Sequence, residues 1–576
     1  MHYTVTPVSP GIAIGRVKTY QPCNHLKGKQ AIPLAKVEDE LQRYDIVRAR
    51  ADEELSALSK KIAKSDPDTA KIFNAQRDIL NDQVLVQEIR TTIKKDLVSL
   101  QKAVQDVYDK YIALLSGSAN KLIAQRASDL ADVKKSLVKF CGNFKGLDLS
   151  NLPAETILVA QELFPSDTAS LNFENVVAIV TEEGGVTSHT GIIARSIGIP
   201  AVVWGDALKI LADEDEVAVD AIAGILVHKP DNGEKKSFFS LRRKWIKERE
   251  ENARYRKGAL LTKDGKRINI GVNIGSASEA ELASLDFADG SGLFRTEFLF
   301  LGKDSMPNEE EQFQKYRMVL ERAKGKPVTL RTLDIGGDKE LPYLPLPREN
   351  NPFLGVRGIR LCFEHPELFL TQLRAAYRAS VFGKLEIMFP MVSSIDDVRR
   401  CLDYAKQARN ELYRENIEFN SKVPLGIMIE VPSIALMAEE AADLVDFASI
   451  GTNDLCQYLT ASDRLDARLN TYYQSYHPAL FRCIKFVVKA FSSAGKMVGI
   501  CGELGGEPKA AVLLFGLGIN KLSMNADALP SVKRMLSKIT LEKSRRIAER
   551  ILSMQTAEEI MQYLDATLAC QLNHTN

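Results

Sequence analysis

The sequence has almost no net charge and no long apolar run. Its 76 lysines and arginines balance 75 aspartates and glutamates, so the net charge of +1 excludes a global attraction to nucleic acid or an anionic membrane. No apolar run approaches the roughly 18 residues that cross a bilayer, and the N-terminus "MHYTVTPVSPGIAIG" lacks the regions of a signal peptide. The eight cysteines form no C-x-x-C pair. We therefore expect a cytoplasmic protein with no membrane insertion and no nucleic-acid partner.

A helical block occupies the first quarter of the chain. From Lys36 to about Lys145, apolar residues recur every three or four positions among Glu, Lys and Arg, as in amphipathic helices. A polar joint, "TTIKKDL", separates two such stripes, which indicates helices packed as hairpins. Bundle packing accounts for most of the apolar positions, and the outward-facing remainder forms a reasonable docking surface for another protein.

The segments on both sides of the helical block read as β/α structure. "SPGIAIGRVKTY" precedes the block, and "ETILVAQEL", "VVAIVTEE", "AVVWG" and "EVAVDAIAGILVHK" follow it. We predict one discontinuous domain of residues 1–20 and 146–228, with residues 21–145 inserted as a helical bundle. The charged stretch that follows, residues 229–260, fits a solvated linker helix.

The remaining residues, 261–576, predict a TIM (β/α)8 barrel. Eight short apolar runs alternate with helical segments over a length typical of that fold. We therefore assign the chain to the multidomain α/β class. The runs are "INIGVNIG", "GSGLFRTEFLF", "PVTLRTLDIGG", "KLEIMFPMV", "PLGIMIEVPS", "DFASIGTNDL", "MVGICGELGG" and "KLSMNA".

Charged side chains cluster late in these runs, where a barrel builds its active site. Each residue alone also fits a surface ion pair, but together they favour a binding site. Arginine forks match phosphate and carboxylate oxygens, and two carboxylates at strand ends suit Mg²⁺ held partly by substrate oxygens. The expected ligand is small and strongly anionic. The arginines are Arg295, Arg331 and Arg464, and the carboxylates are Glu430 and Asp454.

Two further residues have both a structural and a chemical interpretation. Cys501 fits a buried core cysteine, but its strand-end position also allows a thiol that donates a proton to an enolate. His189 follows the turn "GGVTSH" and begins the short helix "TGIIARSIG", where free N–H groups favour an anion. A capping histidine and a nucleophile that carries phosphate are both consistent with that position.

The motif series as a whole resembles enzyme I of the phosphoenolpyruvate:sugar phosphotransferase system. The resemblance covers essentially the whole chain and includes the order of the motifs, the helical insert and the total length. It is carried by "GGVTSHTGIIARSIGIPAVV", "GLFRTEFLFL", "LRTLDIGGDKELPY", "NPFLGVRGIR", "IMIEVPS", "SIGTNDLCQY", "SDR" and "GICGELGGE".

The resemblance implies a Mg²⁺-dependent phosphoenolpyruvate (PEP)–protein phosphotransferase that releases pyruvate. His189 would lie in a swivelling domain and carry the phosphoryl group, with Thr168 of "PSDTASL" orienting it. HPr, a small histidine-containing carrier protein, would bind the helical insert and receive the group for sugar uptake, and the barrel would form a homodimer. At the barrel, Arg295, Arg331, Arg464, Asn453 and Asp454 would bind PEP, Glu430 and Asp454 would hold Mg²⁺, and Cys501 would protonate enolpyruvate.

The sequence departs from the family pattern at three positions. Val186 stands where the family usually has arginine, Phe164 where a hydroxyl residue is usual, and Cys456 where threonine is common. We expect these changes to affect the rate of transfer and the identity of the carrier. The chemistry itself should be unaffected, because the residues with expected bond-making roles are present.

Three alternative interpretations differ from this one in features that the sequence shows. PEP synthases and pyruvate phosphate dikinases need an ATP-grasp domain for which this chain has no room. The nitrogen-related paralogue of enzyme I carries a GAF-type domain ahead of "SPGIA", where this chain has only eight residues. It stays the alternative, together with a regulatory phosphocarrier protein without a role in sugar transport. A non-catalytic scaffold would predict a broken arginine or metal set, and the set is intact.

Overall fold

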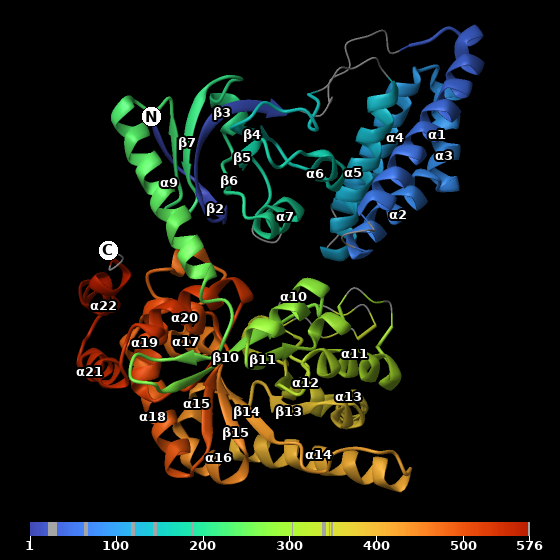
Figure 1. The fold of residues 1–576 in the computed structure, drawn as a ribbon. Helices are drawn as coiled ribbons and strands as arrows, with labels where there is room; N and C mark the ends of the chain where they lie inside the picture. The colour runs from blue at the N-terminus through green and yellow to red at the C-terminus, as the bar shows by residue number, and fades with distance from the viewer. Residues whose placement is uncertain are drawn as a thin grey trace. The chain divides into compact units, whose positions relative to one another are not determined.

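The computed structural model describes residues 1–20, 31–62, 67–116, 121–141, 147–185, 188–301, 303, 305–336, 341, 343, 344, 346 and 349–573. The described chain divides into two compact units, Met1–Arg249 and Glu250–Asn576, whose elements are labelled in Figure 1. Across the described residues, no helix combines the length and the apolar character needed to cross a membrane.

A mixed β-sheet forms the core of one part of the first unit, and the helical insert forms the other part (Figure 1). In the described residues its strand order is β1-β8-β7-β3-β4-β5-β6-β2. Strand β3 pairs in parallel with β4, which follows the helical block in the sequence, and antiparallel with β7. The sheet is thus built from two separate parts of the chain. The strands are β1 (His2–Thr4), β2 (Thr6–Ser9), β3 (Ile12–Tyr20), β4 (Thr156–Ala160), β5 (Val176–Thr181), β6 (Ala201–Val203), β7 (Glu216–Asp220) and β8 (Ile225–His228).

Five helices of the described residues form the insert, with a core of its own. Buried positions on α3, among them Ile89 and Ile93, pack with Tyr44, Val104 and Val133 from three other helices. The break expected at "TTIKKDL" lies at the end of that stretch: α3 continues to Asp96, and the chain turns at Leu97, which has a φ of 50°. The helices are α1 (Val37–Ile62), α2 (Pro67–Leu80), α3 (Gln83–Asp96), α4 (Leu100–Ser116) and α5 (Lys121–Cys141).

Short helices follow strands of the first unit. Helix α6 (Pro165–Ser170) follows β4, α7 (His189–Ile197) follows β5, and α8 (Ala207–Ile210) follows β6. Ser188 caps α7 by accepting a hydrogen bond from the Gly191 N–H at 3.2 Å. Gly198 ends α7 in the left-handed conformation, with a φ of 80°. The helix expected after the "GGVTSH" turn is therefore confirmed.

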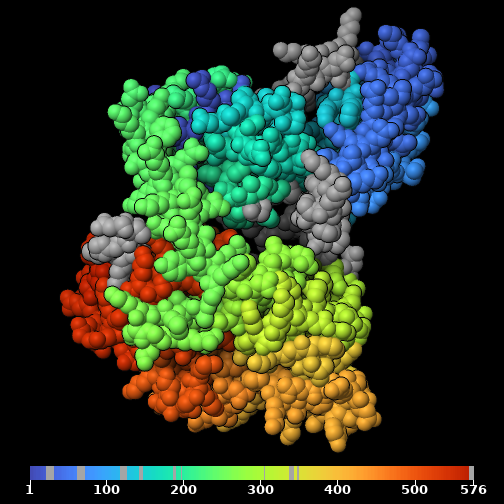
Figure 2. Space-filling view, in the orientation of Figure 1, coloured from blue at the N-terminus to red at the C-terminus, as the bar shows by residue number. Residues whose placement is uncertain are grey.

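The charged stretch after β8 forms helix α9 (Asn232–Ala253). Among its residues, only Phe238 is buried. Figure 2 shows the side chains of α9 at the surface of the protein. Such exposure explains why the sequence of this helix tolerates dense mixed charge.

The second unit contains a closed parallel barrel, and the expected TIM-barrel fold is confirmed. Strands β11 to β17 pair in sequence order, and β10 closes the ring by pairing in parallel with both β11 and β17. All eight apolar runs form barrel strands in the described residues. They are β10 (Arg267–Ile274), β11 (Gly290–Arg295), β12 (Pro327–Arg331), β13 (Lys384–Phe389), β14 (Leu425–Ile429), β15 (Phe447–Ile450), β16 (Met497–Ile500) and β17 (Lys521–Met524).

Helices surround the barrel and continue beyond its last strand. The short strand β9 (Leu260–Leu261) adds an antiparallel partner to β10. The helices are α10 (Glu279–Ser284), α11 (Glu309–Arg322), α12 (Ile359–Glu364), α13 (Pro366–Ala379), α14 (Ile395–Arg414), α15 (Pro432–Leu436), α16 (Ala438–Leu444), α17 (Thr452–Thr460), α18 (Pro478–Ser493), α19 (Pro508–Leu517), α20 (Leu529–Ser537), α21 (Leu541–Leu552) and α22 (Ala557–Asn573).

Candidate active site

A polar pocket opens at the C-terminal ends of the barrel strands, with a volume of about 520 Å³. It brings together all seven residues that the sequence predicted for the barrel: Arg295, Arg331, Glu430, Asn453, Asp454, Arg464 and Cys501. Each of these residues lies at the C-terminal end of a barrel strand or in the segment that connects that strand to the next one. The other lining residues are Leu293, Asp334, Gly336, Phe353, Arg357, Met428, Gly451, Leu465, Tyr473, Gly502 and Glu503.

Arg331 ends β12 and is held by two buried carboxylates. Its Nη2 donates to Glu297 Oε1 at 2.7 Å, and its Nη1 lies 2.9 Å from Asp334 Oδ2. Burial alone would lower the pKa of this guanidinium, but Glu297 and Asp334 outweigh burial and raise it. Arg331 is buried, with 7% of the residue exposed, so these two carboxylates fix its position before any ligand arrives.

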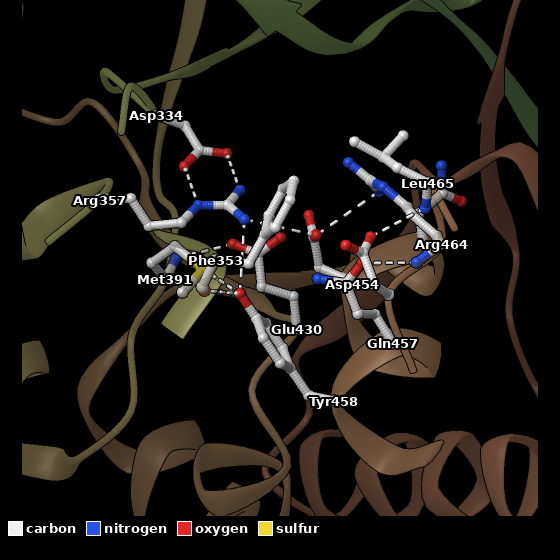
Figure 3. A network of polar contacts seen from close by, with 12 residues as sticks. Asp334, Phe353, Arg357, Met391, Glu430, Asp454, Gln457, Tyr458, Arg464 and Leu465 are labelled. Carbon is white, nitrogen blue, oxygen red and sulfur yellow. Dashed lines mark hydrogen bonds and ion pairs between the residues drawn. The ribbon is translucent and has the colours of Figure 1, made fainter. Parts of the chain in front are cut away.

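Arg357 and Asp334 are pocket residues to which the sequence analysis gave no role. The Arg357 fork donates to both oxygens of Asp334, at 3.1 Å from Nε and 2.9 Å from Nη2, as Figure 3 shows. Its Nη1 lies 3.5 Å from Asp454 Oδ1. Asp334 stands late in the run "PVTLRTLDIGG", so the position of polar groups in the runs could have indicated it. Arg357 stands in "NPFLGVRGIR", outside all eight runs, and left no such signal.

Glu430 and Asp454 face the same part of the pocket from two neighbouring strand ends (Figure 3). Glu430 Oε1 accepts the N–H of Met391 at 2.7 Å. Burial, with Asp454 and Asp334 nearby, raises the pKa of Glu430 to about 8. A Cβ at Gly451 would lie 2.8 Å from Glu430 Oε2, so the absence of a side chain there leaves room for the carboxylate.

This carboxylate pair fits a divalent cation. Asp454 Oδ1 is buried and accepts no hydrogen bond from the described residues, although Nη1 of Arg357 and Nη1 of Arg464 each lie 3.5 Å away. No cluster of three or more His, Cys, Asp or Glu side chains that could bind a metal occurs in the described residues. A cation held here would therefore complete its shell with ligand oxygens or water, as Mg²⁺ commonly does.

Asn453, Arg464 and Arg295 complete the polar rim of the pocket. Asn453 Oδ1 accepts the N–H of Glu503 at 3.2 Å, which ties α17 to the segment after β16. The Arg464 N–H donates to Gln457 Oε1 at 3.2 Å, which fixes the loop after α17. Arg295 is exposed at the end of β11. The rim therefore presents two guanidinium groups that are less buried than Arg331 and Arg357.

Cys501 lies just past β16 at the floor of the pocket. Its side chain packs with Leu293, Met388, Met428 and Phe447 and is 2% exposed. Burial raises the pKa of this thiol to about 11. At neutral pH the group is therefore a protonated thiol that can donate a proton.

The other two predicted residues, His189 and Thr168, belong to the first unit. His189 begins α7, but its side chain and residue Val186 lie outside the described part of the structure. Thr168 is buried in α6, and its Oγ1 donates to the carbonyl of Pro165 at 3.0 Å. Thr190 Oγ1 donates to the Leu163 carbonyl at 3.1 Å, which joins the first turn of α7 to the chain just before α6.

The two departures that lie in described residues are accommodated locally. The Phe164 N–H donates to Asp167 Oδ2 at 3.0 Å, so the backbone at this position retains its capping contact. Cys456 is buried in α17, with its Sγ 3.4 Å from the Gln474 carbonyl, and is not among the pocket-lining residues.

Comparison with known proteins identifies the family. Three family descriptions match the chain: "PEP-utilising enzyme, N-terminal" over residues 5–126, "PEP-utilising enzyme, mobile domain" over 152–224 and "PEP-utilising enzyme, PEP-binding domain" over 249–541. Among solved structures, an enzyme I protein determined by NMR has 31% sequence identity, covers 42% of this chain and 99% of its own, and gives a TM-score of 0.37.

Curated relatives match over nearly the full length. The phosphoenolpyruvate-protein phosphotransferase of Bacillus sp. (strain S) is 38% identical over 566 residues, 97% of either chain. The enzyme of the same name from Staphylococcus carnosus (strain TM300) is 41% identical over 505 residues, 86% of this chain and 87% of its own. The resemblance to enzyme I is thereby confirmed. The chain belongs to the PEP-utilising enzyme family, and within it to the phosphoenolpyruvate-protein phosphotransferases.

Proposed function

We propose that the protein transfers the phosphoryl group of PEP to His189, releases pyruvate, and passes the group on to a histidine of an HPr-type carrier protein for sugar uptake. The observation that carries this proposal is the convergence of four arginines, the carboxylates of Glu430 and Asp454, and one protonated thiol in a single barrel pocket. PEP would use all three kinds of group: the arginines bind its phosphate and carboxylate, the two carboxylates hold the cation that contacts the phosphate, and the thiol protonates its methylene carbon.

In the first half-reaction, an imidazole nitrogen of His189 attacks the phosphorus of PEP. The P–N bond forms as the bond from phosphorus to the enol oxygen breaks, and the electron pair leaves with enolpyruvate. Cys501 Sγ then gives its proton to the methylene carbon, which produces pyruvate, and the thiolate recovers a proton from solvent. Arg295, Arg331 and Arg464 bind the phosphate and carboxylate, with Asn453 in support and Arg357 beside them. Thr168 orients the imidazole.

Glu430 and Asp454 are the proposed holders of Mg²⁺. The ion would neutralise negative charge on the phosphate and help to orient it when bound. Two features support this assignment. Asp454 has a buried oxygen that accepts no hydrogen bond from the described residues. The pKa of Glu430 is raised mainly by burial and then by the nearby Asp454 and Asp334, and a bound cation would favour the ionised carboxylates.

The helical insert is the proposed site for the carrier. A groove of about 470 Å³ lies on this insert and combines apolar with charged side chains. Val84, one of its lining residues, is 63% exposed and adds an apolar contact surface to the groove. The lining residues are Asp78, Ile79, Asp82, Val84, Leu85, Tyr111, Leu115, Arg126 and Leu130.

The remaining assignments follow from the family. We assign residues 1–20 and 146–228 to the phosphohistidine domain, 21–145 to the carrier-binding insert, 229–260 to the linker and 261–576 to the barrel. His189 serves both the barrel and the carrier, so its domain swivels between them. We also propose a homodimer formed through the barrel, in the cytoplasm.

The test of this function uses Mg²⁺ and ³²P-labelled PEP. The wild-type protein should acquire one acid-labile, base-stable label, as expected for phosphohistidine, and release pyruvate. The His189→Ala variant should fold normally but remain unlabelled, because the substitution removes the nucleophile that accepts the phosphoryl group. Label on this variant at the wild-type level would refute the assignment of His189.

A further inference from the structure

One carboxylate, Asp132 of α5, joins the helical insert to the sheet-containing part of the first unit. Asp132 is 1% exposed, and both of its oxygens accept hydrogen bonds. Oδ2 accepts the Ser166 N–H at 3.2 Å, and Oδ1 accepts the Ser166 hydroxyl. Ser166 lies in the first turn of α6, where the backbone N–H groups have no partner within their own helix. Asp132 therefore caps α6 from a different helix.

A second carboxylate strengthens the same junction. Asp167 of α6 caps its own helix through the Phe164 N–H, and its Oδ1 accepts the Tyr20 hydroxyl and the ammonium of Lys135, which lies on α5. The Lys135 Nζ lies 5.4 Å from the centroid of the Tyr20 ring and 5.3 Å from that of Phe164. Since α6 is only six residues long, these contacts rather than helix propensity fix its orientation.

The same carboxylate is also tied to the groove of the insert. Gln76 of α2 is fully buried, and its Nε2 donates to Asp132 Oδ2 at 3.0 Å. Helices α2 and α5, which are joined by this bond, both supply residues to the groove, among them Ile79 and Leu130. A shift of either helix at the groove therefore acts on the cap of α6.

We propose that Asp132 is a positioning residue, which holds α6 so that Thr168 stays aligned with His189 and couples this alignment to the carrier groove. The inference rests on the proposed role of His189. Thr168 lies two residues after Ser166 on α6, and the Leu163 carbonyl just before α6 accepts the hydroxyl of Thr190, the residue next to His189. Asp132 touches none of the reacting atoms and acts only through α6.

The test measures single-turnover labelling of His189 by ³²P-PEP with Mg²⁺, at several PEP concentrations. We expect Asp132→Asn to lower the rate constant at saturating PEP by about tenfold, because an amide replaces one acceptor oxygen with a donor. The PEP concentration at half-maximal rate should stay unchanged, since PEP binds in the barrel. Ser166→Ala keeps the carboxylate and removes one donor, so it should show a smaller fall in the same direction.

A matched control removes a carboxylate elsewhere on the insert. Asp109 of α4 pairs with Lys134 of α5 at 2.7 Å and is exposed, so Asp109→Asn should keep the wild-type rate. Wild-type rates in both Asp132→Asn and Ser166→Ala would overturn the proposal. An equal fall of the rate constant in Asp109→Asn would also overturn it. So would a rise in the PEP concentration at half-maximal rate that is as large as the fall in the rate constant. If the wild-type protein is not labelled at His189, the proposed function itself fails, and the inference loses its basis.

Discussion

Replacing Cys501 by serine tests the proposed proton donor with little change in packing. The thiol sits among apolar side chains at the pocket floor, 2% exposed, and its pKa is about 11. At about pH 7.5 it is essentially fully protonated, so the group is always ready to donate. A serine hydroxyl occupies similar space but is a far weaker acid.

The expected loss follows from the usual contribution of a positioned general acid, roughly 10²–10⁴ in rate, or about 3–5 kcal/mol in barrier height. The affected step is the formation of pyruvate from PEP. Transfer between phosphorylated His189 and a carrier involves no enolate and should keep its rate. The wild-type enzyme should also show no loss of rate from thiol ionisation below about pH 10, because the buried thiol stays protonated until the pH approaches its raised pKa.

The assay follows pyruvate release and, separately, phosphate exchange between His189 and the carrier. Cys456→Ser is the matched control, since Cys456 is also buried in the barrel unit but does not line the pocket. We expect this control to keep both rates. An equal loss of both half-reactions in Cys501→Ser, or wild-type pyruvate release, would refute the role of Cys501 as the acid.

Three other changes have defined outcomes. Glu430→Gln and Asp454→Asn should each raise the Mg²⁺ concentration needed for half-maximal turnover by tenfold or more, and an unchanged Mg²⁺ response in both would place the metal elsewhere. Lys533→Met should lower the free energy of unfolding, measured by urea denaturation, by ~3 kcal/mol. Lys533 Nζ donates to the carbonyls of Arg256, Gly258 and Phe287 at 3.3, 2.8 and 2.8 Å, and the substitution removes all three bonds. Lys489 is exposed, so Lys489→Met is the control. The fragment of residues 1–249, one compact unit, should accept phosphate from a phosphorylated carrier but not from PEP, whose pocket lies in the other unit; labelling of the fragment by PEP would contradict this division.

The barrel was predictable because its strands leave a local signal. Each strand is buried on both faces, so each appears in the sequence as a short apolar run, and the polar residues that end the runs fall at one edge of the ring. The same logic located Arg331, Glu430 and Cys501 before any geometry was known. For His189 the local pattern was insufficient, because a histidine at a helix start fits both a cap and a nucleophile. Its proposed role as the phosphate carrier rests on the family resemblance.

The parts that the sequence did not determine depend on contacts between distant segments. The break expected at "TTIKKDL" falls only at its last residue, Leu97, because Ile93 is buried against the other helices and keeps most of this polar stretch helical. Arg357 carries a charge in a loop, where most arginines are solvated, and only the folded barrel brings it within 2.9 Å of Asp334.

Asp132 is the clearest example of a residue whose role the sequence pattern does not indicate. In sequence it is one acidic residue on a charged amphipathic helix, with nothing to separate it from its neighbours. The folded unit buries it and gives it three donors from α2 and α6. The sequence by itself determined the barrel strands and the residue types at their ends, because periodicity and burial act locally. Only the tertiary structure decided which charges meet, since desolvation and hydrogen bonding depend on segments that lie far apart in the chain.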